Sequence, residues 1–182
     1  MRTFIALELP VPIKDLLAET SRELQQYNQR NLKWVLPENM HITFQFLGDV
    51  SESHLGDIRE IIQQNSSSIE PPEFTHPQLQ LVSPGNPHVL WISYQCECAL
   101  LEKAHRRIRS DISHLGYKLD SKPLVFHVTL ARIKGTLQPH FIDAVLKYIL
   151  PQPSFKADKL TLFQSILHPE GPTYHSLYSL ML

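Results

Sequence analysis

Residues 41–48 read His41-Ile-Thr-Phe-Gln-Phe-Leu-Gly48, and residues 127–134 read His127-Val-Thr-Leu-Ala-Arg-Ile-Lys134. Both stretches begin with histidine, an apolar residue and threonine, and the offset from residue 41 to residue 127 is 86 positions. The match extends further, because at the same offset His54 corresponds to His140 and Asp57 to Asp143. Self-similarity at a fixed spacing indicates an internal duplication, so each half of the chain is expected to build the same elements.

The apolar pattern predicts strand, helix, strand, strand, helix and strand in each half. The first strands are expected at 4–9 and 90–95, the second at 32–36 and 118–124, and the last at 79–82 and 160–163. The first helix of each half is predicted from Ile13, Leu16, Leu17, Leu24 and Tyr27, and from Leu101, Ala104, Ile108, Ile112 and Leu115. The second is predicted from Leu55, Ile58, Ile61 and Ile62, and from Phe141, Val145, Leu146, Ile149 and Leu150. Ser51 is a suitable cap for one of these second helices, and Pro139 suits the first turn of the other.

This order predicts an α+β fold with two pseudo-two-fold-related lobes, each an antiparallel sheet with helices on its outer face, and an active-site cleft between them. We expect residues 1–182 to form a single bilobal domain, with one repeat over about 2–82 and the other over about 88–163. The tail, residues 165–174 followed by 176–182, is expected to form a C-terminal hairpin, and the connector at 83–87 is its counterpart in the first half.

Composition excludes several classes of function. The 182 residues carry a formal net charge of −1, which does not suit a protein that coats duplex nucleic acid or an anionic membrane. No stretch approaches the roughly 18 apolar residues that span a bilayer, and the N-terminus resembles a strand more than a signal peptide. Cys96 and Cys98 lie too close in sequence for a good structural disulfide, so a reduced, cytoplasmic location is expected.

The sequence also predicts no cofactor and no metal. Only 6 glycines are present, and no GxGxxG or Walker-type phosphate loop occurs among them. The 10 histidines show no HExxH motif and no His-x-His or His-x-x-x-His spacing. The other eight histidines are expected on the surface or in loops, with His54 and His140 as marks of shared ancestry.

The repeated motif places an acid–base pair on one face of a sheet. Residues i and i+2 of a strand share a face, so His41 lies beside Thr43 and His127 beside Thr129, while the residues between them face the core. Two imidazoles can act as one base and one acid near neutral pH, and two hydroxyls can hold the oxygens of an anion. A phosphodiester under in-line attack needs this set of groups.

Arg132 can add a fixed positive charge to this site. It lies five residues after His127, which is the wrong parity for the histidine face of a regular strand. We therefore expect Arg132 past the strand end or beyond a bulge. Its counterpart in the first half is Phe46.

The paired His-x-Thr motifs resemble those of the 2H phosphoesterase superfamily, and more closely the RNA 2′,3′-cyclic phosphodiesterases, also called 2′-5′ RNA ligases. The resemblance covers nearly the whole chain. It rests on Arg2-x-Phe4-Ile5-Ala6, Trp34, residues 41–48, residues 126–132, Leu160-x-Leu162, Ser165, Gly171 and Tyr174. Phe44 departs from the family pattern, which more often has Leu there, but it is expected to face the core.

The resemblance implies a metal-free reaction on RNA ends or nucleosides that carry a 2′,3′-cyclic phosphate. Water attacks phosphorus, the 3′ oxygen leaves and a 2′-phosphomonoester remains; an RNA 5′-hydroxyl in place of water gives ATP-independent 2′-5′ ligation. By similarity, His41 is the proton donor and His127 the proton acceptor, while Thr43, Thr129 and Arg132 bind the phosphate. No membrane and no protein partner is implied, and a monomer is expected.

Other interpretations stay open at this point. The chain could act on small cyclic nucleotides or 2′-5′ oligonucleotides, or be a non-catalytic RNA-end binding module. Phe46 and Tyr174 suit stacking on a terminal base, and a core role is the alternative for Phe46. The basic run at 105–109 favours a solvated helix face over an RNA contact.

Overall fold

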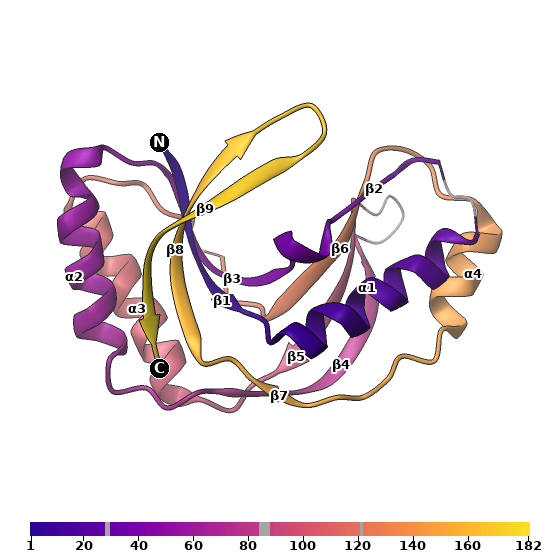
Figure 1. The fold of residues 1–182 in the computed structure, drawn as a ribbon, viewed down its shortest axis with the longest axis horizontal. Helices are drawn as coiled ribbons and strands as arrows, with labels where there is room; N and C mark the ends of the chain where they lie inside the picture. The colour runs from indigo at the N-terminus through magenta and orange to yellow at the C-terminus, as the bar shows by residue number, and fades with distance from the viewer. Residues whose placement is uncertain (28–29, 84–87, 121) are drawn as a thin grey trace.

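The structure is a computed structural model, and it describes residues 1–27, 30–83, 88–120 and 122–182. The α-helices are α1 (Val11–Gln25), α2 (Leu55–Ser66), α3 (Ala99–His114) and α4 (Pro139–Lys147), with short 3₁₀ turns at Pro37–Asn39 and Glu52–His54. The strands are β1 (Arg2–Glu8), β2 (Leu32–Trp34), β3 (His41–Asp49), β4 (Glu73–Val82), β5 (Val89–Gln95), β6 (His127–Ile133), β7 (Phe155–Lys156), β8 (Lys159–Leu167) and β9 (Pro172–Met181). Figure 1 shows their arrangement.

The strands form one curled antiparallel sheet with two symmetric arms. The strand order is β7-β4-β5-β6-β3-β1-β8-β9, and β2 pairs with β6 in addition. The arms meet where β3 pairs with β6, at Ile42 opposite Val128. Outward from this contact, β3, β1 and β8 on one side correspond to β6, β5 and β4 on the other. The predicted α+β architecture is therefore confirmed, and the two histidine strands lie at its centre.

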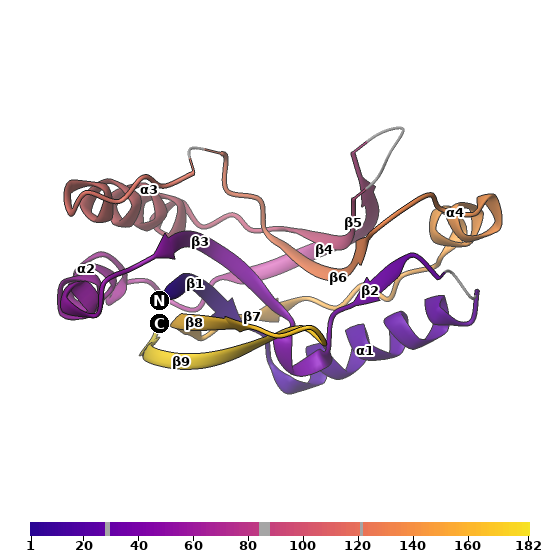
Figure 2. The ribbon, with the colours of Figure 1, turned by 90° about the horizontal axis from the view of Figure 1, so that it is seen from above.

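The helices pair at the two ends of the sheet (Figures 1 and 2). At one end α2 lies beside α3, where Asn65 Nδ2 donates to Asp111 Oδ2 at 3.1 Å. At the other end α1 lies beside α4, where the Tyr148 hydroxyl donates to Glu23 Oε2 at 2.6 Å. Each pair combines one helix from each half of the chain. The two halves therefore interlock instead of each folding into a lobe of its own.

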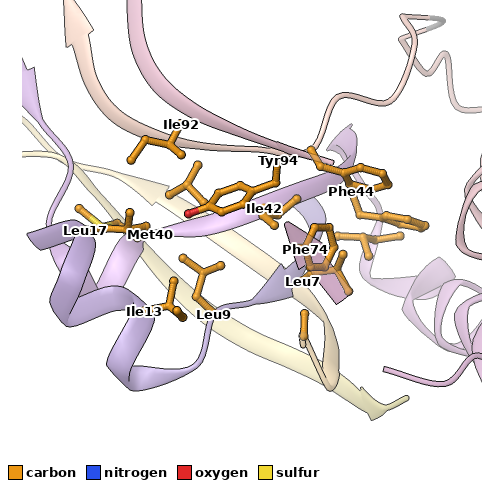
Figure 3. Packing of buried hydrophobic residues seen from close by; sticks show 14 of the residues in the cluster. Leu7, Leu9, Ile13, Leu17, Met40, Ile42, Phe44, Phe74, Ile92 and Tyr94 are labelled. Atoms are coloured by element: carbon orange, nitrogen blue, oxygen red, sulfur yellow. The ribbon is translucent and has the colours of Figure 1, made fainter. Parts of the chain in front are cut away.

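The core lies between the sheet and the helices, as the motif predicts. Ile42, Phe44, Val128 and Leu130 are all at most 2% exposed. Figure 3 shows Ile42 and Phe44 packed among apolar side chains from β1, β5 and α1. Burial of each such side chain stabilises the fold by about 1.5–3 kcal/mol. This packing fixes the opposite face of β3 and β6 as the one that carries the histidines and threonines.

Three details of the predicted elements are wrong, and a fourth lies outside the described residues. The described residues of 118–124 form no strand: Pro123 has no N–H to donate, and Asp120 Oδ1 accepts a local hydrogen bond from the Lys122 N–H. Helix α1 ends at Gln25, so Tyr27 lies beyond it and is 45% exposed. Helix α4 ends at Lys147, so Ile149 lies beyond it and is 91% exposed, whereas Leu146 lies within the helix on its exposed side, at 76%. The connector at 83–87 cannot be compared, since residues 84–87 are not described.

The predicted starts of the second helices are confirmed for α4 and only in part for α2. Ser51 Oγ accepts from the Ser53 N–H at 3.4 Å and so caps the 3₁₀ turn that leads into α2, whereas α2 itself has no side-chain cap. Pro139 is the first residue of α4. The C-terminal hairpin is confirmed as well, since β8 and β9 pair along their length.

Candidate active site

The four residues of the two motifs lie on one face of the sheet. Along both β3 and β6 the burial alternates: His41, Thr43, His127 and Thr129 are partly exposed, and the residues between them are buried. Because Ile42 pairs with Val128, the histidine and threonine that flank each of these residues lie next to those of the other strand. The two His-x-Thr motifs therefore meet as a compact cluster of two imidazoles and two hydroxyls.

A bulge in β6 brings Arg132 to this same face. In the β5–β6 register Leu90 pairs with Ala131 and Trp91 with Thr129, so Leu130 is the extra residue. Leu130 and Ala131 are both buried, and the side chain of Arg132 is exposed. The predicted bulge before Arg132 is confirmed, and the alternative position past the end of the strand is wrong.

The same bulge occurs in β3. There Ile5 pairs with Gln45 and Ala6 with Thr43, which leaves Phe44 as the extra residue. Phe46 therefore shares the face of His41 and is 54% exposed. The core role considered for Phe46 is wrong. The two equivalent positions after the bulges thus present a phenyl ring and a guanidinium group toward the same site.

Hydrogen bonds to the backbone set the tautomer of both imidazoles. His41 Nδ1 lies 2.7 Å from the Asn39 carbonyl oxygen, and His127 Nδ1 lies 2.8 Å from the Val125 carbonyl oxygen. A carbonyl oxygen only accepts, so Nδ1 carries the proton in both rings. In the neutral rings Nε2 is then the basic nitrogen. His41 Nε2 lies 3.1 Å from the Thr43 hydroxyl, which donates to it.

Burial keeps both imidazoles neutral in the free protein. Desolvation lowers the pKa of His41 to about 4; the Asn39 hydrogen bond opposes this shift, and the positive charges of Lys14, His127 and Arg132 add to it. Desolvation also lowers the pKa of His127, against the hydrogen bond to Val125. The pKa of His41 therefore depends on Arg132, and on His127 when that ring is protonated, as expected for one common site.

Aromatic rings surround the two histidines. His41 packs against Phe4, with ring centroids 4.9 Å apart, and against the edge of Tyr174, at 5.3 Å. His127 packs against Trp91 at a shorter centroid distance of 4.1 Å. The sequence singled out Tyr174, but it gave no role to Phe4 or Trp91. Their places depend on cross-strand register, which no local pattern encodes.

The β8–β9 hairpin holds Tyr174 over the site. Lys33 Nζ donates to the Pro169 carbonyl oxygen and Asn39 Nδ2 to the Pro172 carbonyl oxygen, both at 2.9 Å. The hairpin thus reaches from the β1 arm toward β2, on the far side of the β3–β6 contact (Figure 1). No pattern in the sequence predicted these two hydrogen bonds, because they join residues far apart in the chain.

One of the remaining histidines, His105, is buried. His105 is only 7% exposed and its Nε2 lies 3.0 Å from Gln45 Oε1, so the expected surface position is wrong for it. Burial, with the charges of Arg109 and Arg106, lowers its pKa. His54 and His140 make structural hydrogen bonds, to the Tyr117 hydroxyl and to the Tyr27 carbonyl oxygen.

Metal sites and membrane-spanning helices do not occur in the described parts of the chain. Among the described residues, no group of three or more His, Cys, Asp or Glu side chains is placed to hold a metal ion. No helix within the described ranges has the length and apolar character to cross a membrane. Cavities of about 360 and 350 Å³ lie between β4 and α4 and beside α3, and neither is lined by His41 or His127.

Comparison with known proteins places this geometry in a family. The family model described as LigT like Phosphoesterase matches residues 7–91 and 97–174. The chain is 32% identical to the RNA 2′,3′-cyclic phosphodiesterase of Archaeoglobus fulgidus, over 97% of this chain and 98% of that one. It is 29% identical to the protein of the same name from Thermotoga maritima, over 98% of this chain and 94% of that one.

Solved structures share the fold. A protein of Thermus thermophilus superposes with a TM-score of 0.78 at 24% identity, over 100% of this chain and 98% of that chain. The LigT protein of E. coli complexed with 3′-AMP superposes with a TM-score of 0.73 at 21% identity, over 100% and 97%. The fold and the paired motifs define a phosphoesterase. The chain belongs to the LigT-like phosphoesterase family.

Proposed function

We propose that this phosphoesterase hydrolyses the 2′,3′-cyclic phosphate at RNA ends and leaves a 2′-phosphomonoester. The observation that carries the proposal is the meeting of two His-Thr pairs on one exposed sheet face. The names of the relatives from Archaeoglobus fulgidus and Thermotoga maritima support the same substrate class. RNA termini and nucleoside 2′,3′-cyclic phosphates both present the reacting group.

In the proposed reaction the two imidazoles move one proton each. His127 Nε2 accepts a proton from water as the water oxygen bonds to phosphorus. His41 Nε2 donates a proton to the 3′ oxygen as the bond from phosphorus to that oxygen breaks. The Nδ1 hydrogen bonds of both rings support these roles, because they direct Nε2 toward the open face.

Three further side chains would hold the phosphate. Thr43 and Thr129 have hydroxyl donors on the histidine face, and Arg132 supplies a fixed charge with a planar fork of N–H groups. Their contacts with the non-bridging oxygens would stabilise the negative charge on these oxygens in the transition state. Phe46, exposed on the histidine face, and Tyr174 are suited to stack on the base of the terminal nucleotide.

The donor role of His41 requires that substrate binding charges it. Its pKa is lowered to about 4 in the free protein, so at pH 7 the ring is neutral. A bound phosphate anion favours the imidazolium and opposes the desolvation that lowers the pKa. We therefore expect His41 to take up a proton as the anionic substrate enters.

The same site would support ATP-independent 2′-5′ ligation, with an RNA 5′-hydroxyl in place of water. The proton transfers and the phosphate contacts are all supplied by this chain's side chains, so we propose that neither metal nor cofactor takes part. We also propose a monomeric, cytoplasmic enzyme that needs no protein partner.

We further propose that residues 1–182 are one bilobal domain that arose by duplication. The repeats would span about 2–82 and 88–163, with the C-terminal hairpin added to residue 182. The 86-residue offset supports this, since β3 and β6 begin at His41 and His127, and β4 and β8 begin at Glu73 and Lys159. The bulge at the same position of both histidine strands is a second support.

The test uses three substrates in parallel: an RNA oligonucleotide with a 2′,3′-cyclic phosphate end, a nucleoside 2′,3′-cyclic phosphate, and a 2′-5′ oligonucleotide. Hydrolysis of the RNA end to a 2′-phosphomonoester, unchanged by EDTA, is the expected result. His41→Ala and His127→Ala should each lower kcat about 10²- to 10⁴-fold.

Other outcomes would refute the proposal in distinct ways. Turnover of only the nucleoside, or of only the 2′-5′ oligonucleotide, would identify a relative with another substrate. Binding of RNA ends without turnover would identify a binding module. Loss of activity with EDTA would contradict the metal-independent mechanism, and full activity of both alanine variants would exclude the histidine pair.

A further inference from the structure

Trp91 makes an unusually close contact with one of the two site histidines. Its ring centroid lies 4.1 Å from that of His127, with the ring planes inclined by 40°. Trp91 lies on β5 and pairs with Thr129 of β6, and Ser93 of β5 pairs with His127. The indole is therefore a diagonal neighbour of the imidazole on the same sheet face, within reach of a large side chain.

A hydrogen-bond network fixes the indole in this position. Trp91 Nε1 donates to Gln80 Oε1 at 2.9 Å, and the Ser93 hydroxyl donates to the same oxygen at 3.3 Å. Gln80 lies opposite Trp91 in the β4–β5 ladder, so the strand register itself brings the two side chains together. Because Gln80 binds the polar edge of the indole, the ring is held at a defined tilt against His127.

The other histidine has no equivalent neighbour among the described residues. The ladder position opposite Thr43 is occupied by Ala6, whereas the one opposite Thr129 is occupied by Trp91. The rings beside His41 are Phe4 and Tyr174, with centroids at 4.9 and 5.3 Å. The two imidazoles of the duplicated fold therefore have different aromatic neighbours, and only His127 packs against a tryptophan among the described residues.

We propose that Trp91 is a positioning residue that makes His127 the base of the reaction, by holding its imidazole and by stabilising the imidazolium that forms when water is deprotonated. The inference rests on the proposed function. A cation within about 6 Å of a tryptophan centroid is attracted by the negative face of the ring, more strongly than by phenylalanine or tyrosine. A base gains positive charge in the transition state, so such a ring favours proton acceptance at the histidine it covers.

The test compares Trp91→Leu, Trp91→Phe and Gln80→Leu. Trp91→Leu should lower kcat about 2- to 30-fold with little change in KM, the range that a cation–π contact provides. It should also move the titration of the His127 ring, followed by NMR of the imidazole carbons, to lower pH. Trp91→Phe should lower kcat and shift the His127 titration less than Trp91→Leu does. Gln80→Leu should lower kcat because the indole is no longer held at a fixed tilt.

Trp34→Leu is the matched control. Trp34 pairs with Ala131, whose side chain is buried on the other face of β6, so loss of this tryptophan tests the cost to folding without touching His127. Thermal unfolding of every variant separates folded proteins from damaged ones.

The inference is overturned if a folded Trp91→Leu protein keeps wild-type kcat and an unshifted His127 titration. It is also overturned if the loss falls on KM alone, which would make Trp91 a substrate contact. The NMR titration needs no turnover. An inactive wild-type protein would therefore refute the proposed hydrolysis while the titration still decided the contact between the rings.

Discussion

Acid should destabilise this protein through His41, to a degree that the structure specifies. The pKa of this ring is lowered from 6.5 to about 4, mainly by burial. Above pH 6.5 the ring is neutral in both the folded and the unfolded chain, so it adds no pH dependence. Between pH 6.5 and 4 His41 is protonated in the unfolded chain but stays neutral in the folded protein, so the free energy of unfolding falls as the pH falls. The free energy of unfolding should drop by about 2 kcal/mol at pH 5 and about 3 kcal/mol at pH 4 from this group alone.

His41→Gln isolates this contribution, because the amide does not titrate and its N–H₂ can still donate to the Asn39 carbonyl oxygen. Urea unfolding followed by circular dichroism at pH 7, 6, 5 and 4 gives the free energy of both proteins. Other titrating groups cancel in the difference, so the gap between variant and wild type should shift by about 3 kcal/mol in favour of the variant from pH 7 to 4. His175→Gln, at an exposed position, is the control. A gap that stays constant with pH would refute the assignment of a buried, neutral His41.

The other predictions concern pH, the two residues after the bulges, and the hairpin. Since burial lowers the pKa of both His41 and His127, kcat/KM should peak below pH 6.5, and a peak above pH 7.5 would contradict this. Arg132→Lys keeps the charge but loses the planar fork, so kcat/KM should fall about 10- to 100-fold; wild-type activity would show that the guanidinium does not touch phosphate. Phe46→Leu should raise KM for RNA ends about 5- to 100-fold with kcat nearly constant, whereas an unchanged KM would exclude stacking. Asn39→Ala removes the bond to the β9 backbone, so amide hydrogen exchange at the start of β9 should accelerate while that of β4 does not; equal exchange would mean that the bond does not hold the hairpin.

The sequence predicted the parts of this molecule that depend on short-range pattern. Alternation in residues 41–44 and 127–130 placed Ile42 and Val128 in the core and the histidines on the opposite face, because a strand has a fixed period of two. The parity of Arg132 predicted either a bulge or a position past the strand end, and the structure has the bulge. Apolar spacing predicted most positions of the longer helices, although Tyr27 lies beyond the end of α1.

Features that depend on the partner across the sheet were not predictable. Trp91 lies beside His127 only because β5 and β6 pair in one register, and Phe4 reaches His41 in the same way. The alternatives for Phe46 stayed open for a related reason, since the bulge in β3 that places it on the exposed face had no signal in the sequence. The exposure of Ile149 shows that apolar periodicity does not predict where a helix ends, and residues beyond that end need not be buried.

The exchange of helices between the two halves has a consequence for synthesis of the chain. Strand β1 is synthesised before its partner β8, which begins at Lys159. Helix α1 is likewise synthesised before α4, the helix it lies beside, which begins at Pro139. Neither end of the sheet is complete until most of the polypeptide has left the ribosome. His41 of β3 therefore lacks its partner motif on β6 until residues 127–133 have also been synthesised. Loop closure over such distances slows folding, so the nascent enzyme should gain its structure in one late, cooperative step.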